Sequence, residues 1–181
     1  FLMLNVLYKA LETLPDLLSQ TEKWDSLIVN RRKPHTYRVF TQWPVNPYFR
    51  ICLHRFDVCD TEEAFSHPHP WEGGFLLLKG SYHMQVGQSI NRTAQPTHVM
   101  NMDLHAGSSY AITGPTTWHS VTPYEETYTV MVNGQPWEKN YAHAECRTTK
   151  GKDLEKFSQE ELISHLNIFK ELIYRYNRGE I

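Results

Sequence analysis

The sequence predicts an all-β core flanked by an α-helical segment at each end of the chain. Between residues 37 and 132, short apolar runs alternate with turn residues such as Gly, Pro and Asn, and no run of helical periodicity separates them. The segments before and after this region repeat leucines and aromatic residues at three- and four-residue steps, which is the spacing of an amphipathic helix. Many short strands without intervening helices favour an antiparallel sandwich or barrel over an α/β sheet.

Helical periodicity bounds the chain on both sides. Residues 2–24 are expected to be helical, although Pro15 interrupts the pattern, so either two short helices or one kinked helix is expected. Near the other end, Ser158 followed by Glu161 matches a capping box, which predicts a helix over residues 158–177. The apolar stripe of the first segment consists of Leu4, Leu7, Leu11, Leu14 and Leu18.

The central region is expected to hold a series of short strands separated by turns. Lys79-Gly80 and Thr113–Thr116 are predicted turns, and Asn133-Gly134 is a strong signal for a two-residue hairpin. Strands are expected at residues 37–40, 48–57, 75–78, 81–86, 97–102, 108–112, 117–121 and 128–132.

Size and composition limit the possible functions. The 181 residues fit one domain, and 40% hydrophobic residues suffice for a packed core. The net charge of −2 argues against a general nucleic-acid or membrane-surface binder, and no apolar run approaches the ~20 residues of a membrane span. The three cysteines, Cys52, Cys59 and Cys146, form no C-x-x-C pair, so free thiols and a cytoplasmic location are expected. No nucleophile elbow, P-loop or dinucleotide fingerprint occurs.

One stretch, Ser66–Gly80, carries most of the chemical information. His67 and His69 stand one residue apart, so on an extended strand both imidazoles point the same way. Glu72 follows at once, and His119 lies 50 residues downstream, after the turn that contains Gly114-Pro115. Three histidines and one carboxylate brought to one point would form a site for a divalent first-row metal ion.

This arrangement resembles the two metal motifs of the cupin superfamily. The order is H-x-H, Glu and Gly, followed by a distant Gly-Pro and His, although the first motif is one residue short between His69 and Glu72. The longer string L-H-R-F, H-x-H-P-W-E and G-x-Y is similar to a group of small bacterial and phage-type cupins. The resemblance covers roughly residues 37–140. It implies a jelly-roll barrel, or double-stranded β-helix, within a single domain, and a metal bound by His67, His69, Glu72 and His119.

The donor set does not choose among Fe(II), Mn(II), Ni(II), Zn(II) and Co(II), and Fe(II) is favoured for the oxygen chemistry considered below. Other residues on or beside the motif strands are candidates for the pocket. Tyr82, His54 and Tyr110 are candidates for proton transfer, with core packing as the alternative for each. Candidate substrate contacts are Arg55, Trp71 and Trp118; for Arg55 the alternative is a structural ion pair.

The function predicted from these residues is that of a metal-dependent cupin enzyme. A dioxygenase-type oxidoreductase acting on a small polar molecule is the first hypothesis. A metal-dependent isomerase, epimerase or lyase is the second, and a non-catalytic cupin that binds a small ligand is the third, because one fold hosts many functions. The resemblance also implies pairing into a homodimer through the barrel edges.

Overall fold

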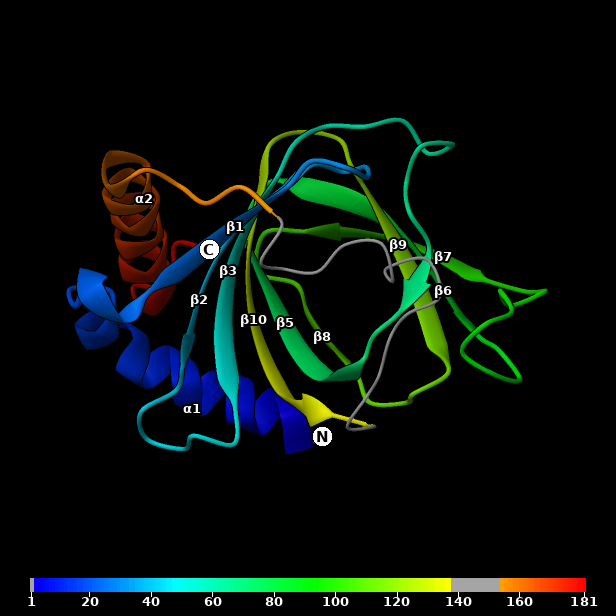
Figure 1. Cartoon of the computed structure of the whole chain (residues 1–181), viewed down its shortest axis with the longest axis horizontal. Helices are drawn as coiled ribbons and strands as arrows, with labels where there is room; N and C mark the ends of the chain where they lie inside the picture. The colour runs from blue at the N-terminus through cyan, green and yellow to red at the C-terminus, as the bar shows by residue number, and fades with distance from the viewer. Residues whose placement is uncertain (1, 138–153) are drawn as a thin grey trace.

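The computed structural model describes residues 2–137 and 154–181. Two antiparallel β-sheets, one of six strands and one of four, face each other (Figure 1). Helix α1 (Leu2–Leu17) and helix α2 (Gln159–Asn177) both lie on the outer side of the larger sheet. The expectation of an all-β core with a helix at each end is therefore confirmed.

The strands follow a jelly-roll order. In the larger sheet the order is β1 (Asp25–Val29), β2 (Thr36–Gln42), β3 (Arg50–Phe56), β10 (Thr127–Pro136), β5 (Trp71–Lys79) and β8 (Ser109–Ile112). In the smaller sheet it is β4 (His67–Pro68), β9 (Thr117–Pro123), β6 (Ser81–Gln88) and β7 (Met100–His105).

Pairing of β3 with β10, β4 with β9, β5 with β8 and β6 with β7 is what results when one long antiparallel ribbon is rolled up. Among the described residues no strand belongs to both sheets, so the expected barrel is an open two-sheet sandwich. The expected barrel range ran to residue 140, and residues 138–140 lie outside the described part of the chain, as does Cys146.

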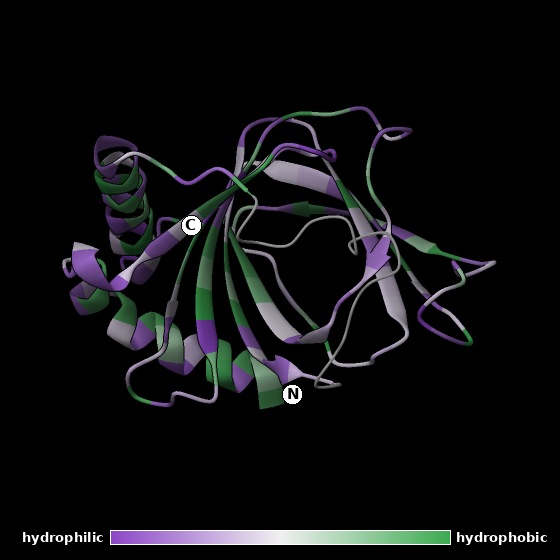
Figure 2. Ribbon diagram, viewed as in Figure 1, coloured by the Kyte–Doolittle hydropathy of each residue, from purple (hydrophilic) through white to green (hydrophobic). Residues whose placement is uncertain are grey.

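The main hydrophobic core lies between the six-stranded sheet and the two helices. Figure 2 shows the helices as bands of hydrophobic and hydrophilic residues, the pattern of amphipathic helices packed on a sheet. Gly74 of β5 lies so close to α1 that an added Cβ would stand 2.8 Å from the Met3 carbonyl oxygen, so glycine permits this close approach. The fully buried residues of this core include Leu7, Leu14, Val39, Leu53, Val130 and Phe169.

Both helix ends have local causes. Helix α1 continues through Pro15 to Leu17, because a proline in the last turn removes a single intrahelical hydrogen bond. The Trp24 indole then donates a 3.1 Å hydrogen bond to the Leu17 carbonyl oxygen. At α2 the predicted capping box is present, since the Glu161 amide donates to the Ser158 hydroxyl and the Ser158 amide donates to the Glu161 carboxylate.

Three local predictions were wrong. The first helix ends at Leu17 and not near residue 24, and the unexpected strand β1 begins at Asp25. The strand expected at residues 97–102 lies at Met100–His105, and Asn133-Gly134 is not a hairpin turn but lies inside β10. Gly134 instead allows the close approach of Glu72, whose Oε1 would stand 3.1 Å from an added Cβ. The turn at Gly80 was correct: this glycine has a φ of +82°, which L-residues rarely adopt.

Cys52 and Cys59 are both free and buried, as expected of thiols that form no disulfide. Of the helices in residues 2–137 and 154–181, none is long and apolar enough to cross a membrane.

Candidate metal centre

Three histidines converge between the two sheets. His67, His69 and His119 each offer one ring nitrogen, and these three nitrogens lie within 4.8 Å of one another. The Nε2 atoms of His69 and His119 are 2.7 Å apart. Two nitrogens bound at neighbouring corners of one octahedral ion would lie about 3 Å apart, because metal–nitrogen bonds are about 2.1 Å long. The residues present therefore fit a metal ion bound by three imidazoles.

The local sequence explains why these rings meet. His67 and His69 each precede a proline, which disfavours helical backbone and keeps both residues extended, so that the two side chains point the same way. Strand β4 then pairs with β9 so that His67 and His119 are direct cross-strand partners. The prolines and this single pairing bring together histidines that are 50 residues apart.

Burial keeps the two inner rings neutral. Burial first, and then the neighbouring histidines and Arg38, hold the pKa of His69 well below its usual value. Burial and the nearby His67 do the same to the pKa of His119. A neutral imidazole offers a lone pair to a metal ion. The Nδ1 of His67 lies 3.2 Å from the Phe65 carbonyl oxygen, a hydrogen bond that leaves Nε2 as the acceptor atom.

Glu72 is not part of this cluster. Along β5, Phe75 points toward the histidines, with its ring centroid 5.4 Å from that of His69. Glu72 is an odd number of residues from Phe75 and therefore points to the opposite face, where its side chain lies beside Gly134. The structure thus does not bring the predicted fourth ligand to the three histidines. The missing residue in the first motif is the reason, because a shift of one residue on a strand reverses the face.

Two of the proton-transfer candidates, Tyr82 and Tyr110, lie next to each other on the inner side. Their hydroxyls are 2.8 Å apart, and the Tyr110 ring stacks on Phe75 at 4.7 Å. Burial raises the pKa of both phenols, so each stays protonated at neutral pH. Each phenol can donate a hydrogen bond, but the raised pKa does not suit either of them to act as a base.

The third candidate, His54, belongs to a polar group that the sequence analysis missed. His54 is 3% exposed on the inner face of β3, and its Nε2 accepts a 2.8 Å hydrogen bond from Nε of Arg38 on β2. Burial first, and then the charge of Arg38, hold the pKa of His54 well below its usual value. A signal for Arg38 was present in the sequence, because it alternates with Tyr37 and Val39 and so shares a face with Phe40.

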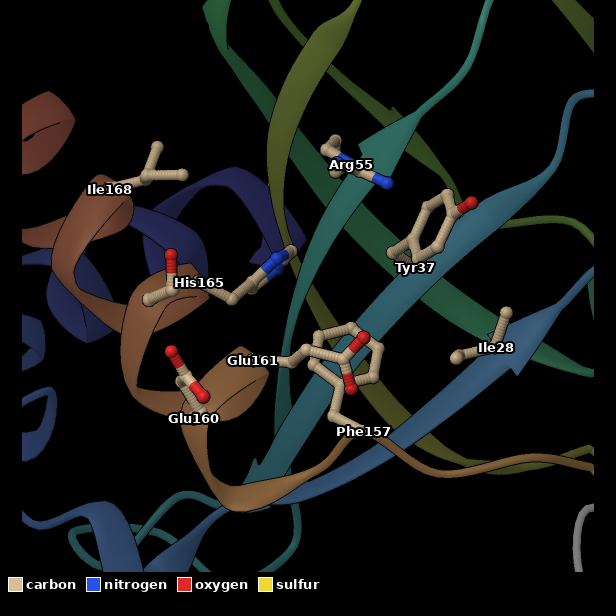
Figure 3. Close-up of a pocket in the computed structure, with 9 residues that line it drawn as sticks. Ile28, Tyr37, Arg55, Phe157, Glu160, Glu161, His165 and Ile168 are labelled. Carbon is tan, nitrogen blue, oxygen red and sulfur yellow. The ribbon is translucent and has the colours of Figure 1, made fainter.

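Arg55, a predicted substrate contact, lies on the other side of the same sheet. It lines a pocket of about 300 Å³ between α2 and strands β1 to β3, which Figure 3 shows. Its guanidinium lies 3.8 Å from the centre of the Tyr37 ring and forms ion pairs with Asp57 at 3.8 Å and Glu126 at 3.5 Å. The alternative of a structural ion pair therefore describes Arg55 better than contact with a substrate at the histidine cluster.

The two tryptophans predicted to contact substrate, Trp71 and Trp118, lie on opposite faces of their sheets. Trp71 packs on the inner face with Cys52, Phe75 and Met131, near the histidines. Trp118 directly precedes His119 on β9, so it points to the opposite face, and its indole donates a 3.3 Å hydrogen bond to the Asn91 carbonyl oxygen. Only Trp71 remains on the side where a substrate at the cluster could meet it.

The fold and this site define a jelly-roll protein with a cluster of three histidines, two of them buried. No family model matches the sequence, and no curated protein matches it. Hydroxypropylphosphonic acid epoxidase from S. wedmorenis aligns with a TM-score of 0.47 and 14% identity over 60% of this chain and 55% of that chain. Fe(II)-HppE with an alternative substrate aligns with a TM-score of 0.46 and 16% identity, over 60% of this chain and 55% of that chain. FeII HppE in complex with substrate aligns with a TM-score of 0.47 and 17% identity, over 62% of this chain and 57% of that chain. The chain spans about half the length of these structures.

Proposed function

We propose that this chain is a metal-dependent cupin enzyme in which His67, His69 and His119 bind one divalent first-row metal ion. The observation that carries the proposal is the convergence of three ring nitrogens within 4.8 Å inside a jelly-roll sandwich. Two of these rings are buried and neutral, which is the state that binds a metal ion. Fe(II) is the ion we favour, and Mn(II), Ni(II), Zn(II) and Co(II) suit the same donors.

The reaction we propose is a dioxygenase-type oxidation of a small polar molecule. Three protein ligands on a six-coordinate ion leave positions for substrate and O₂, and Fe(II) bound there would supply the redox chemistry. The chain's own residues would exclude water and orient the substrate. Phe75 and Trp71 line the site with apolar surface, and the protonated Tyr82–Tyr110 pair can donate a hydrogen bond.

The first test is elemental analysis of the full chain, purified without added metal or chelator. We expect about one iron per chain, and loss of the metal in His67→Ala and in His119→Ala. The matched control is His105→Ala, which removes an exposed histidine outside the cluster and should retain the metal. Full metal occupancy in both cluster variants, or no metal even after reconstitution of the wild type, would contradict the site.

A second measurement separates the reaction classes. Iron together with O₂ consumption, measured with an oxygen electrode on a panel of small acids, thiols and phenols, would support the oxidoreductase. Bound zinc, nickel or manganese with turnover in the absence of O₂ would instead support an isomerase, epimerase or lyase. Metal that is retained without any turnover across the panel would favour the non-catalytic binding protein.

A further inference from the structure

We infer that Arg38, held in place by His54, is the subsite for an anionic group of the substrate, so that the substrate is a small oxyanion such as a carboxylate or a phosphate. The inference deepens the proposed function and rests on it for the role of the metal. The arginine subsite itself rests on contacts that are independent of any ion.

Arg38 lies on the inner face of β2, directly opposite His54 on β3, and it is half-buried. On β3, Cys52 shares the inner face with His54 and packs against Phe75 and Trp71. The ring centroid of Phe75 lies 5.4 Å from that of His69. Arg38 and the three histidines therefore face the same space between the sheets.

His54 holds the guanidinium of Arg38 in place. The Nε of Arg38 donates the 2.8 Å hydrogen bond to Nε2 of His54, so that ring presents its lone pair to the arginine and its other nitrogen toward Thr129, whose hydroxyl is 3.5 Å away. His54 is nearly fully buried, which fixes the ring. A guanidinium anchored through Nε keeps its two terminal amino groups for a ligand, and these match the two oxygens of a carboxylate or phosphate.

The charged groups near Arg38 favour an anionic ligand. In residues 2–137 and 154–181 no carboxylate forms an ion pair with Arg38, whereas Arg55 on the adjacent strand has two. Three neutral imidazoles do not neutralise a divalent cation, and Glu72 points away from them. With a metal bound, three positive charges would face this interior without an anion, and the cost of removing charges from water falls when an opposite charge pairs with them. An anionic substrate supplies that pairing.

The experiment measures binding of named probes by isothermal titration calorimetry, with and without metal. Glycolate and inorganic phosphate are the anionic probes, and glycolamide is the neutral analogue of glycolate. We expect Arg38→Gln to weaken anion binding about tenfold or more, because hydrogen bonds to charged groups are lost, and to leave glycolamide binding unchanged. The weakening should appear in the metal-free protein as well. A preference for glycolate over phosphate, or the reverse, identifies the oxyanion.

Two further variants keep the test decisive. Arg38→Lys retains the charge without the planar fork and should bind the anions with intermediate affinity, which also serves if Arg38→Gln folds poorly. His54→Leu should reduce the preference for glycolate over glycolamide, because it releases the arginine that His54 positions. Arg50→Gln is the matched control, since Arg50 is an exposed inner-face arginine stacked on Phe40 and should not change anion binding.

The outcomes separate the two proposals. Anion affinity that is equal in wild type and Arg38→Gln overturns the subsite, even if the metal is bound as proposed. Anion binding that vanishes completely on metal removal also overturns it, because the ion alone would then hold the anion. Conversely, Arg38-dependent anion binding by a protein that never takes up metal supports the subsite while the proposed metal enzyme fails.

Discussion

The two faces of the six-stranded sheet carry different kinds of side chain. The outer face, under α1 and α2, buries large aliphatic and aromatic residues, among them Val39, Leu53 and Val130. The inner face of the same strands carries Arg38, His54 and Thr129 beside a smaller apolar group. Because side chains alternate along a strand, one sheet can provide a packed core on one side and a polar site on the other.

Arg55 and Arg38 show the difference most directly. Arg38 lies on β2 and Arg55 on the adjacent strand β3. They belong to neighbouring cross-strand pairs, since Arg38 stands opposite His54 and Tyr37 stands opposite Arg55. The outer arginine stacks on an aromatic ring and has two carboxylate partners, as a structural arginine does. The inner arginine is hydrogen-bonded to a neutral histidine and keeps its charge for a ligand. Sequence composition alone does not distinguish the two, whereas the contacts do.

The largest expected effect belongs to the outer face. Phe169→Ala removes a fully buried ring of α2 from the main core and should lower the free energy of unfolding by about 3–5 kcal/mol. The exposed Tyr174 on the same helix is the control, and Tyr174→Ala should change the free energy of unfolding by less than about 0.5 kcal/mol. Urea unfolding measures both. Equal losses in the two variants would mean that α2 is not part of the core.

The second prediction concerns His165, a histidine buried on the outer face against Tyr128, Phe157 and Phe169. Burial lowers its pKa to about 4 in the folded protein, below the 6.5 expected when unfolded. The unfolded chain therefore binds the proton first as pH falls, so stability is retained above pH 6.5 and lost progressively between 6.5 and 4. The loss at the acidic end is about 3 kcal/mol.

The measurement is the free energy of unfolding from pH 8 to pH 4, with chelator present, for wild type and His165→Gln. The variant lacks the titrating imidazole of residue 165, so its free energy of unfolding should fall by about 3 kcal/mol less than that of the wild type over this pH range. The contributions of the other titrating groups are the same in both proteins and cancel when the two profiles are subtracted. Parallel pH profiles for the two proteins would contradict the buried, neutral state of His165.

A smaller effect separates the two arginines. Arg55→Gln removes two long ion pairs and the contact with the Tyr37 ring, so we expect a loss of about 1 kcal/mol in the free energy of unfolding. Arg38→Gln removes one hydrogen bond to His54 and an inner charge that has no carboxylate partner among the described residues, so we expect a smaller loss than for Arg55→Gln. Chemical denaturation of the two variants gives the comparison. The reverse order would show that Arg38 has the structural role.

The smallest expected effect is at Glu72. Because its carboxylate lies on the face opposite the histidines, Glu72→Gln should leave the metal content unchanged and alter stability by less than about 0.5 kcal/mol. Elemental analysis beside His67→Ala checks this directly. Loss of the metal in Glu72→Gln would restore the fourth ligand predicted from the sequence.

Several features followed from the sequence because their causes are local. The capping box at Ser158 and Glu161 sets the start of α2 through hydrogen bonds within four residues. The alternation of apolar residues predicted most strands. The H-x-H pair, with each histidine followed by proline, predicted the two rings on one side of an extended segment, and the turn signals before His119 indicated the third. These residues also form the cluster that the structure contains.

Other features depended on how distant strands align. Whether Glu72 joins the histidines is decided by the face of β5 on which it falls, set by pairing with β10 and β8, and a one-residue difference reverses it. Asn133-Gly134 is a turn signal in isolation, but the long pairing of β10 with β3 and β5 extends the strand through it.

By itself, the sequence determined the fold class, the helix that begins after Ser158 and the three histidines of the cluster. Each of these depends on neighbouring residues or on the alternation of residues along a strand. The tertiary structure decided which side chains share the interior with them. It placed Arg38 and His54 on that side and Glu72, Arg55 and Trp118 on others. The physical reason is that side chains alternate between the two faces of a strand. Which face points to the interior is decided only when the strand pairs with its neighbours and the helices pack on one side of the sheet.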